Sequence, residues 1–595
     1  MAPQIFIPET APFKTEQRLW LNGYVAGLLA GKGYVIGGEN SVTGKKSATV
    51  PLLILFGSQT GTAEKIAKQI AKDSKSRGCS PRVVDAAEHA KIDWSQEANL
   101  LIVTSTYGDG DMPDNAQGFW DWLQTDAAKA LAHLNFSVLA LGDTNYENFC
   151  AAGKKFDTRL EALGAKRIHP LTDCDLDYEA KTKTWMDGVL AVVSGSGSSQ
   201  KSGDAQLLSP LPRGEGQGEG KASSNFSRNH PFPARLLTNR KLNGEGSQKE
   251  TRHFEISLEG SGLNYEAGDA LGVWASNCPE LVADILHALG CDGEETVKLS
   301  GDEFPLRRAL TEKLDISKPS AELLSHFAKA NSALAGLLAP DRKDDLKKWA
   351  WGRGVIDLLH ENSAVKFSAP EFAALLKPLA PRLYSISSSP KAHAGQVHLT
   401  INVVRYDSHG RARKGLASAF LADRAGAETP VPVFIQTSHG FRLPANGDTP
   451  VIMVGPGTGV APFRAFLHER RATGAKGKNW LFFGEQRAAT DFYYREELEK
   501  MSADGSLTKL STAFSRDQAE KIYVQNRMLE NAAELWAWLE AGAHFYVCGD
   551  ASRMAKDVDA ALHQIIETAG GKSADEAKAC VAKLKTDKRY QRDVY

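Results

Sequence analysis

The sequence predicts a multidomain protein of mixed α/β and β type: a doubly wound parallel sheet, then an antiparallel barrel with a helical insertion, then a second α/β layer. At 595 residues the chain is too long for a single core, because one domain usually holds about 100 to 200 residues. Short apolar runs alternate with helical patterns over residues 51–193 and again over 446–595, which is typical of parallel sheets. Strand-rich stretches dominate residues 228–445, apart from a mainly helical segment at about 278–379.

The composition argues against several classes of protein. Hydrophobic residues make up 42% and charged residues 24%, the balance of a folded globular chain, and a net charge of -1 argues against a nucleic-acid partner. No apolar run approaches the ~18 residues of a membrane span, and the N-terminus lacks the pattern of a signal peptide. We therefore expect a cytoplasmic protein with no membrane partner. The seven scattered cysteines argue against disulfide frameworks, zinc sites and iron–sulfur clusters, so no metal is expected.

Two segments lie outside the three modules. Residues 1–50 include TEQRLWLNGYVAGLLAG, whose apolar residues are spaced like one stripe of a helix. This amphipathic helix serves either self-association or partner contact, or it docks on the chain's own surface. Residues 194–227 are rich in Gly, Ser and Pro and predict a flexible linker. Residues 51–190 carry 15 Lys and Arg against 20 Asp and Glu, an imbalance that either steers docking or reflects chance on a solvated surface.

Three loops in the first module have the chemistry of a flavin mononucleotide (FMN) pocket. The apolar run LLILF leads into GSQTGTAEKIA, where hydroxyl groups and the N-terminus of a helix suit a phosphate. STYGDGDMPDN and LGDTNYENFC follow later strands, at the sheet edge where α/β proteins bind ligands. Tyr107 and Tyr146 in these loops have the aromatic faces needed to stack on a flavin ring. A simple Ser/Thr helix cap and tyrosines used only for packing are the alternative interpretations.

With these motifs, residues 51–190 resemble a flavodoxin domain, which implies FMN as cofactor. The resemblance places cofactor contacts at Ser58, Gln59, Thr60, Gly61, Thr62, Ala63, Ser105, Thr106, Tyr107, Gly108, Leu141, Gly142, Asp143, Thr144, Asn145, Tyr146, Glu147, Asn148, Phe149 and Cys150.

In the barrel region, PRLYSISSS resembles the R-x-Y-S signature of the ferredoxin–NADP reductase family. The resemblance implies that Arg382 meets the pyrophosphate of flavin adenine dinucleotide (FAD), that Tyr384 stacks on its isoalloxazine ring, and that Ser385 hydrogen-bonds near N5. GLAS is a second phosphate-facing loop, although the closest diflavin reductases often carry two glycines where this chain has Gly415 and Leu416. The implied FAD contacts are Arg382, Leu383, Tyr384, Thr400, Ile401, Asn402, Tyr406, Gly415, Leu416, Ala417 and Ser418.

The third module begins with VIMVGPGTGVAPFRAF, in which a glycine-rich turn brings backbone close to a pyrophosphate at a helix N-terminus. Together with FFGEQR it resembles the nicotinamide half of the same reductase family. The motifs SR and KIYVQ supply cations and donors suited to the 2'-phosphate of NADP, unless they form only a solvated basic surface. The predicted coenzyme contacts are Gly455, Gly457, Thr458, Ser515, Arg516, Lys521, Ile522, Tyr523, Val524, Gln525 and Asp557.

Four residues are candidates for the catalytic centre. Buried cysteines are usually inert packing, but the resemblance places Cys548 near the path of the hydride. It also implies that the terminal Tyr595 covers the FAD ring and that Asp593 positions the nicotinamide. Ser385 completes the predicted catalytic group.

The three modules, in this order over residues 51–595, resemble the diflavin reductases. RLWLNGYVAGLL, VVRYDSHGRAR, FRLPAN, GKNWLFFG and RYQRDVY are similar to the flavoprotein (alpha) subunits of assimilatory NADPH-sulfite reductases. This implies electron transfer from NADPH through FAD and FMN to a sirohaem iron–sulfur hemoprotein (beta) subunit, and a homo-oligomeric assembly. Two alternatives stay open: a soluble diflavin reductase for another haem or cobalamin acceptor, and a nonenzymatic flavin-binding electron carrier.

Overall fold

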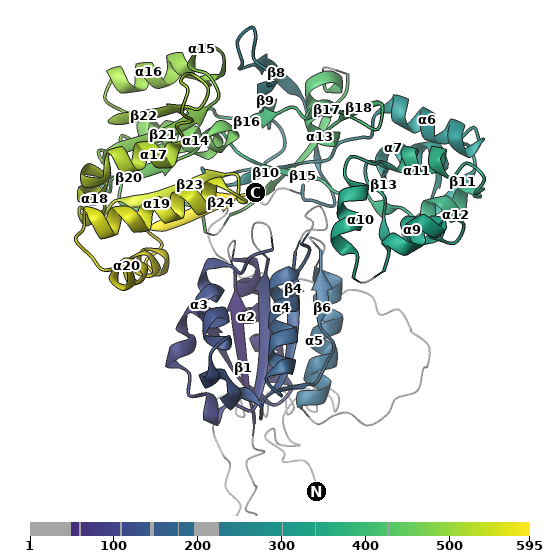
Figure 1. The fold of residues 1–595 in the computed structure, drawn as a ribbon, viewed down its shortest axis with the longest axis horizontal. Coiled ribbons are helices and arrows are strands. Elements are labelled where there is room, and N and C mark those ends of the chain that lie inside the picture. Colours follow the sequence, from purple (N-terminus) through teal and green to yellow (C-terminus); the bar gives the residue numbers. More distant parts are fainter. Residues whose placement is uncertain are drawn as a thin grey trace, which may run out of the picture. The chain divides into compact units, whose positions relative to one another are not determined.

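The structure is a computed structural model that describes residues 49–58, 61–106, 110–142, 148–175, 178–194, 225–299, 301–339, 341–426, 428–438 and 440–595. The predicted N-terminal helix and almost all of the predicted linker lie outside these ranges. The described part confirms the predicted fold class: a flavodoxin-like parallel sheet, an antiparallel barrel with a helical insertion and a second parallel sheet follow one another along the chain (Figure 1). Within it, no helix combines the length and hydropathy of a membrane span.

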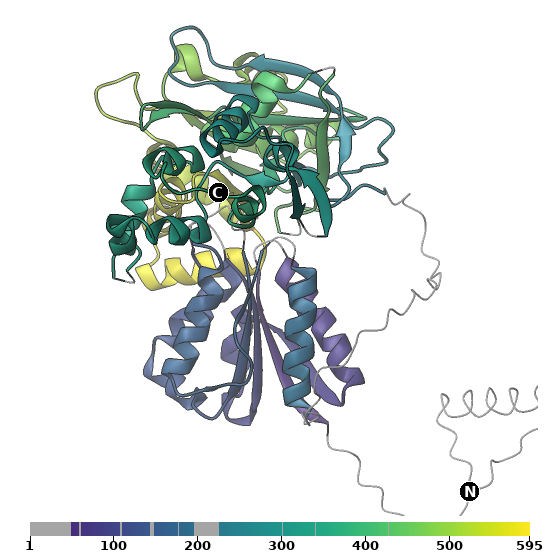
Figure 2. The same cartoon turned by 90° about the vertical axis from the view of Figure 1, so that its right-hand side faces the viewer.

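The first sheet has the strand order β2-β1-β3-β4-β5, and β6 also pairs with β4. β1 runs parallel to β3, and β3 runs parallel to β4, so their carboxyl ends share one edge. Helices lie on both sides of this sheet (Figure 2), which explains why β1 is an unbroken apolar run rather than an alternating one. The elements are β1 (Val50–Gly57), α2 (Thr62–Ser76), β2 (Cys79–Asp85), η1 (Ala86–Lys91), η2 (Trp94–Gln96), β3 (Asn99–Ser105), α3 (Asp114–Leu123), η3 (Asp126–Leu131), β4 (Asn135–Leu141), α4 (Ala151–Ala162), β5 (Lys166–Arg167), β6 (Thr172–Cys174) and α5 (Glu179–Val193).

The barrel consists of two antiparallel sheets with orders β15-β10-β19-β7 and β16-β9-β8. Their inner faces share one apolar core that includes Phe254, Leu271, Leu399 and Val433. The elements are β7 (Phe232–Ala234), β8 (Leu236–Lys241), β9 (Thr251–Ser257), β10 (Ala270–Val273), β15 (Arg382–Ser385), β16 (Gln396–Asn402), β17 (Arg405–Ser408), β18 (Arg411–Lys414), α13 (Leu416–Ala419), the π-helix η4 (Phe420–Arg424) and β19 (Val431–Gln436).

The segment between β10 and β15 forms the helical insertion and has an apolar core of its own. Its apolar residues recur at helical spacing, for example Val282, Ile285 and Leu286 on α6, which are all buried. The elements are α6 (Pro279–Leu289), β11 (Thr296–Leu299), β12 (Asp302–Pro305), α7 (Leu306–Glu312), β13 (Leu314–Asp315), α8 (Ala321–Ala328), α9 (Ser332–Leu337), α10 (Lys343–Ala350), α11 (Val355–Glu361), α12 (Ala369–Ala374) and β14 (Lys377–Pro378).

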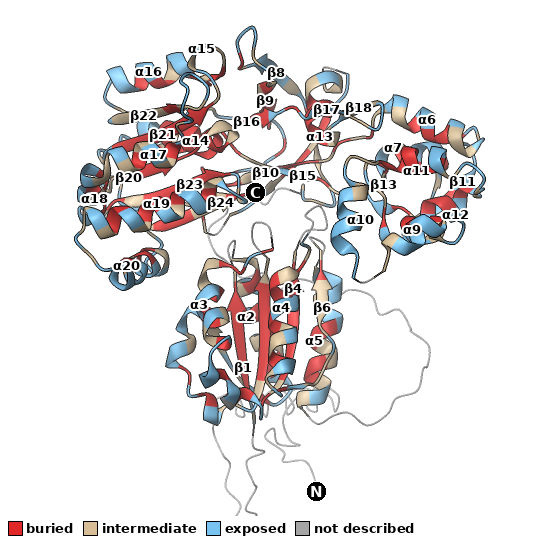
Figure 3. Cartoon of the chain, in the orientation of Figure 1, coloured by how far each residue is buried: buried red, intermediate tan, exposed pale blue. Residues whose placement is uncertain are grey.

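The C-terminal sheet is parallel, with the order β22-β21-β20-β23-β24. Alternate residues of its strands enter two separate cores, Ile452 and Phe482 on one face and Met453 and Phe483 on the other. Both faces are therefore covered, and the strands β20 and β21 are buried along their whole length (Figure 3). The elements are β20 (Val451–Val454), η5 (Gly457–Val460), α14 (Ala461–Ala472), β21 (Asn479–Glu485), α15 (Ala488–Asp491), α16 (Arg495–Ala503), β22 (Lys509–Phe514), α17 (Val524–Glu530), α18 (Ala532–Glu540), β23 (His544–Gly549), α19 (Met554–Thr568), α20 (Ala574–Thr586) and β24 (Tyr590–Val594).

Candidate functional site

The three predicted FMN loops meet at the carboxyl edge of the first sheet. The Thr106 N–H donates to the Leu141 carbonyl at 2.9 Å, and the Thr106 hydroxyl accepts from the Ala152 N–H at 3.2 Å. These bonds join the end of β3 to the end of β4 and to the start of α4. At the end of β1, the Ser58 hydroxyl accepts from the Ala63 N–H at 3.2 Å, in the first turn of α2. The described ends of all three loops thus lie where the sequence predicts a ligand edge.

Only part of this predicted pocket is described. Eleven of its residues have a defined place at the loop ends: Ser58, Gly61, Thr62, Ala63, Ser105, Thr106, Leu141, Gly142, Asn148, Phe149 and Cys150. The others, including both stacking tyrosines, lie outside the described residues: Gln59, Thr60, Tyr107, Gly108, Asp143, Thr144, Asn145, Tyr146 and Glu147. Contact between a flavin and the two tyrosines therefore stays a prediction.

Cys150 points into the protein interior rather than toward a ligand. Its thiol donates to the Ala140 carbonyl at 3.3 Å, and the side chain is fully buried. Burial raises the pKa of the Cys150 thiol to about 12, so the group stays protonated at neutral pH. If Cys150 contacts the cofactor as predicted, it does so through its backbone.

The predicted isoalloxazine contact lies on β15, where Tyr384 faces Leu271 and Ser385 faces Ala270 of β10. Burial raises the pKa of Tyr384 above its ordinary value, so the ring is a neutral aromatic plane. Arg382, two residues earlier, donates to the Ala380 carbonyl at 3.0 Å and keeps other donors for a phosphate. β15 therefore presents the aromatic plane and the cation that the R-x-Y-S resemblance implies.

The remaining predicted FAD contacts divide into two groups. Asn402 and Tyr406 are exposed, and Gly415 to Ser418 follow directly after the β17–β18 hairpin. By contrast, the Thr400 hydroxyl shares a hydrogen bond of 2.6 Å with Tyr494, and the Ile401 side chain lies in the barrel core. These two side chains are occupied within the protein, which leaves only their backbone for a ligand.

A polar cluster, half-buried at Ser385 and Asp593 and fully buried at Cys548, joins the barrel to the C-terminal sheet. The Ser385 hydroxyl donates to Asp593 Oδ2 at 2.6 Å, and the Cys548 sulfur lies 3.9 Å from the same oxygen. The parallel register of β23 and β24 places Cys548 directly beside Asp593. Burial raises the pKa values of both Asp593 and Cys548, and the Asp593 charge raises that of Cys548 further. Two predicted catalytic residues, Ser385 and Cys548, therefore meet at a carboxylate oxygen of a third, Asp593.

The terminal residue Tyr595 lies beside the glycine-rich turn of the C-terminal domain. Its N–H donates to the Gly549 carbonyl at 3.1 Å, and its hydroxyl shares a hydrogen bond of 2.9 Å with the Thr458 hydroxyl. Tyr595 remains 48% exposed. Its stacking on FAD stays a prediction.

The GPGTG turn packs closely on the end of β23. A Cβ atom on Gly459 would lie 2.1 Å from the Cys548 carbonyl oxygen, so glycine is required there. This close approach brings the predicted pyrophosphate turn, with Gly455, Gly457 and Thr458, next to Cys548 and Asp593.

The predicted 2'-phosphate contacts lie after β22 and at the start of α17. Arg516 is exposed and donates to Gln248 Oε1 at 3.0 Å, and Lys521 and Tyr523 are exposed nearby in sequence. Gln525 Nε2 donates to Asp557 Oδ2 at 3.2 Å, which brings these two predicted contacts together. Val524 is buried and Ile522 is packed against the same core, so these two side chains stabilise the fold.

Comparisons with known proteins match each of these regions. Residues 54–202 match the model of the flavodoxin family, residues 224–420 that of the FAD binding domain, and residues 453–560 that of the oxidoreductase NAD-binding domain. The sulfite reductase (NADPH) flavoprotein alpha-component of Bacillus subtilis (strain 168) is 44% identical over 98% of this chain and 96% of its own length. Proteins of the same name from Mannheimia succiniciproducens and Vibrio parahaemolyticus are 42% and 41% identical, over 99% and 98% of this chain and 98% and 93% of their own lengths.

The chain belongs to the family of sulfite reductase (NADPH) flavoprotein alpha-components. It is an NADPH-dependent oxidoreductase of the diflavin type, and its three domains bind FMN, FAD and NADPH.

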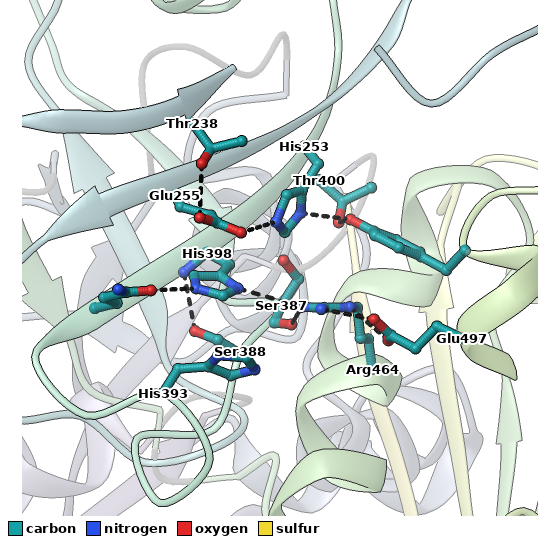
Figure 4. Close-up of polar contacts among 12 residues, drawn as sticks. Thr238, His253, Glu255, Ser387, Ser388, His393, His398, Thr400, Arg464 and Glu497 are labelled. Carbon is teal, nitrogen blue, oxygen red and sulfur yellow. Dashed lines mark hydrogen bonds and ion pairs between the residues drawn. The ribbon is translucent and has the colours of Figure 1, made fainter. Parts of the chain in front are cut away.

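In this flavoprotein a buried polar network, which the sequence did not indicate, fixes the barrel to the C-terminal domain (Figure 4). Arg464 on α14 donates to both carboxylate oxygens of Glu497 on α16, at 2.7 and 2.8 Å. A third nitrogen of Arg464, Nη1, donates to the carbonyl of Ser387, two residues beyond Ser385, at 2.8 Å. Arg464 therefore connects the helix that follows the GPGTG turn to the segment that holds Ser385.

Two histidines on neighbouring barrel strands complete the network. His253 on β9 bonds Tyr494 through Nδ1 and Glu255 through Nε2, at 2.9 and 3.2 Å. His398 on β16 bonds Gln396 through Nε2 at 3.1 Å and faces Arg464 through Nδ1 at 3.4 Å. One ligand atom each of His253, Glu255 and His398 lies within 4.8 Å of the others, but every ring nitrogen already has a protein partner. We therefore assign this cluster to domain attachment rather than to metal binding.

The network makes the stability of the protein depend on pH. Burial first, and Arg464 second, lower the pKa of His253 to about 4 from an ordinary value of 6.5. Because this folded pKa is depressed, the unfolded chain binds a proton below pH 6.5, and stability falls as the pH drops from 6.5 to about 4. We expect the free energy of unfolding in urea to fall between pH 7.5 and pH 5 by about 2 kcal/mol less in His253→Gln than in the parent protein. The exposed His287→Gln should behave as the parent; equal losses in His253→Gln and the parent would contradict the assignment.

Proposed function

We propose that this chain is the electron-supplying subunit of an assimilatory sulfite reductase and that it serves a sirohaem iron–sulfur hemoprotein. The observation that best supports the location of the oxidoreductase site is the hydrogen bond of 2.6 Å from Ser385 to Asp593, with the Cys548 sulfur 3.9 Å from the same Asp593 oxygen. This contact joins the FAD-binding barrel to the NADP-binding domain at the point where a nicotinamide and a flavin must meet. Family membership over nearly the full length supports the choice of acceptor.

The described residues fit the three cofactors by their chemistry. β15 offers an aromatic plane and a guanidinium, the first sheet offers three loops at one edge, and the C-terminal domain offers the GPGTG turn. Held at these residues, FAD would supply hydride acceptance from NADPH, and FAD and FMN together would supply one-electron transfer. Asp593 holds Ser385 by a hydrogen bond, Arg464 fixes the segment behind Ser385, and the buried surroundings of Cys548 exclude water. The domain boundaries that we propose are 51–193, 228–445 and 446–595, with a linker at 194–227.

We further propose the cytoplasm as the location and a homo-oligomeric assembly. The predicted helix of residues 1–50, outside the described residues, is the proposed contact for assembly. Analytical ultracentrifugation of the full chain and of a chain lacking these residues would test this role. If the number of chains in the assembly stayed the same after the deletion, residues 1–50 would have no role in assembly.

The coenzyme preference depends on Arg516. Arg516→Ala should raise the Kd for NADP⁺ roughly 10- to 100-fold, because one charge-assisted bond to the 2'-phosphate is lost. The Kd for NAD⁺, which lacks this phosphate, should change less than about 3-fold. Lys500→Ala, which removes an exposed cation from α16, is the matched control. If Arg516→Ala weakened the binding of NADP⁺ and NAD⁺ equally, Arg516 would not bind the 2'-phosphate.

Anaerobic mixing with NADPH tests the electron path itself. Protein loaded with both flavins should lose flavin absorbance in two phases. Protein that retains FAD but lacks FMN should show only the first of these phases. The depleted protein should also fail to reduce the hemoprotein. Undiminished hemoprotein reduction without FMN would contradict the proposed order of transfer.

A further inference from the structure

Two exposed aromatic side chains face one another between the helical insertion and the barrel. Trp351, directly after α10, is 71% exposed, and Tyr406 on β17 is 44% exposed. Their ring centroids are 6.2 Å apart, with an angle of 39° between the planes. Single exposed aromatic residues need no explanation, but here two elements of the fold converge to place two open rings together.

The backbone, rather than contact between the rings, holds this pair in position. The Trp351 carbonyl accepts a hydrogen bond from His409 Nε2 at 3.1 Å, in the turn of the β17–β18 hairpin. The next residue, Gly352, has φ +73°, and a Cβ atom on it would lie 2.1 Å from Ser408 Oγ. Glycine therefore permits the chain after α10 to approach the hairpin closely, and this approach sets the indole beside Tyr406.

The hairpin also sets the distance from Tyr406 to the second phosphate loop. Tyr406 is opposite Arg413 in the antiparallel register, and Gly415 follows two residues later. FAD has two planar ring systems, isoalloxazine and adenine, joined through a pyrophosphate. If Tyr384 takes the isoalloxazine ring and residues 415–418 take the pyrophosphate, the remaining aromatic site at Tyr406 is left for the adenine.

We propose that Trp351 forms the second face of an aromatic clamp that holds the adenine of FAD against Tyr406. This inference rests on the FAD site of the proposed function. A planar base between two parallel rings needs about 7 Å between their planes, twice the carbon–carbon contact distance. From the observed pair, with centroids 6.2 Å apart and planes at 39°, the rings must therefore move apart by about 1 Å and turn toward parallel. Trp351 also lines a hollow of about 450 Å³ together with Asp344, Lys347 and Lys348, which leaves room for this movement.

The binding of FAD to the full-length protein, freed of FAD, tests the clamp. Trp351→Ala should raise the Kd for FAD roughly 10- to 100-fold, as alanine substitutions of base-stacking aromatic residues do. Trp351→Phe keeps an aromatic face and should stay within about 5-fold of the parent. The FMN content, measured in the same samples, should not change. Adenosine 5'-monophosphate should quench the tryptophan fluorescence of the parent protein, and this quenching should be absent in Trp351→Ala.

Trp349→Phe, a substitution within α10 two residues before Trp351, is the matched control. Trp349 packs against the core of the insertion, with the Arg353 guanidinium 4.3 Å from its ring centre. Its substitution therefore removes an indole that is not part of the proposed clamp. Its Kd for FAD should match that of the parent. A similar Kd for FAD in Trp351→Ala, Trp349→Phe and the parent would overturn the clamp and leave the proposed function intact.

Two other results separate the remaining possibilities. If the parent protein binds no FAD, the proposed function itself fails. If Trp351→Ala lowers the melting temperature of the FAD-free protein by as much as that of the loaded protein, the ring pair is a structural contact and the clamp is wrong. A lowering confined to the FAD-loaded protein supports the clamp, because ligand binding stabilises only the state that binds it.

Discussion

Asp593→Asn should slow the reduction of FAD by NADPH roughly 100- to 1,000-fold, the range seen when one preorganised electrostatic group is removed from an active site. A nicotinamide ring gains positive charge as its hydride leaves, and in the proposed function the half-buried Asp593 carboxylate stabilises that charge. Asparagine has nearly the same shape and can still accept from the Ser385 hydroxyl, so the loss isolates the negative charge. Stopped-flow absorbance after anaerobic mixing with NADPH measures the rate directly.

The control for this substitution is Asp587→Asn, just before β24. Asp587 pairs with Lys583 at the surface, at 2.8 Å, and should leave the rate unchanged. The Kd for NADP⁺ should stay close to that of the parent in both variants, because the predicted effect lies in the transfer step. A hydride-transfer rate within about 3-fold of the parent in Asp593→Asn would show that the carboxylate has no electrostatic part in the reaction.

Arg464→Met should destabilise the protein by about 3 kcal/mol, because it leaves the Glu497 carboxylate without its bidentate cationic partner. This lies at the low end of the usual range for buried pairs, since the Glu497 side chain keeps 30% exposure to water. Burial alone would raise the pKa of Glu497, but the hydrogen bond from His468 and the Arg464 charge hold it at about 2. Glu497 is therefore ionised at neutral pH, and the whole loss in the free energy of unfolding should be measurable by urea unfolding at pH 7.5.

A double-mutant cycle separates the ion pair from the other contacts of Arg464. In Arg464→Met/Glu497→Leu no charge is left unpaired, so the double variant should be more stable than Arg464→Met alone. Arg464→Lys keeps the charge but cannot donate to both oxygens of Glu497, and its loss should be intermediate. Additive losses in the cycle would show that Arg464 and Glu497 do not act as a pair.

The sequence predicts the fold and the ends of the site loops because both depend on local patterns. Alternation of apolar runs with helices predicts the parallel sheets. The loop after a parallel strand lies at the ligand-binding edge of its own sheet, whatever the position of that sheet relative to the other domains. Ser385, Cys548 and Asp593 could be assigned from motifs on β15, β23 and β24, and the parallel register then sets Cys548 beside Asp593. The resemblance, rather than composition, supplied their roles.

Other features depend on tertiary contacts that leave no local pattern. Arg464 follows the GPGTG turn by a few residues and gives no sign that it bonds Glu497 and Ser387 across two domains. His253 and Glu255 alternate on a strand, which is typical of a polar face, yet His253 is buried against Tyr494. The pairing of Trp351 with Tyr406 likewise requires the close approach at Gly352. The side chains of Thr400 and Ile401 also bond or pack within the protein, so the predicted contact of these two residues with FAD stays a prediction for their backbone.

NADPH-dependent production of sulfide from sulfite tests the central claim most directly. The protein, loaded with FAD and FMN, would be mixed with a sirohaem iron–sulfur hemoprotein from the same source. We predict sulfide only when both proteins and NADPH are present, and a loss of sulfide with Asp593→Asn in proportion to its slower flavin reduction. Rapid reduction of ferricyanide by NADPH without any sulfide would contradict the proposed acceptor.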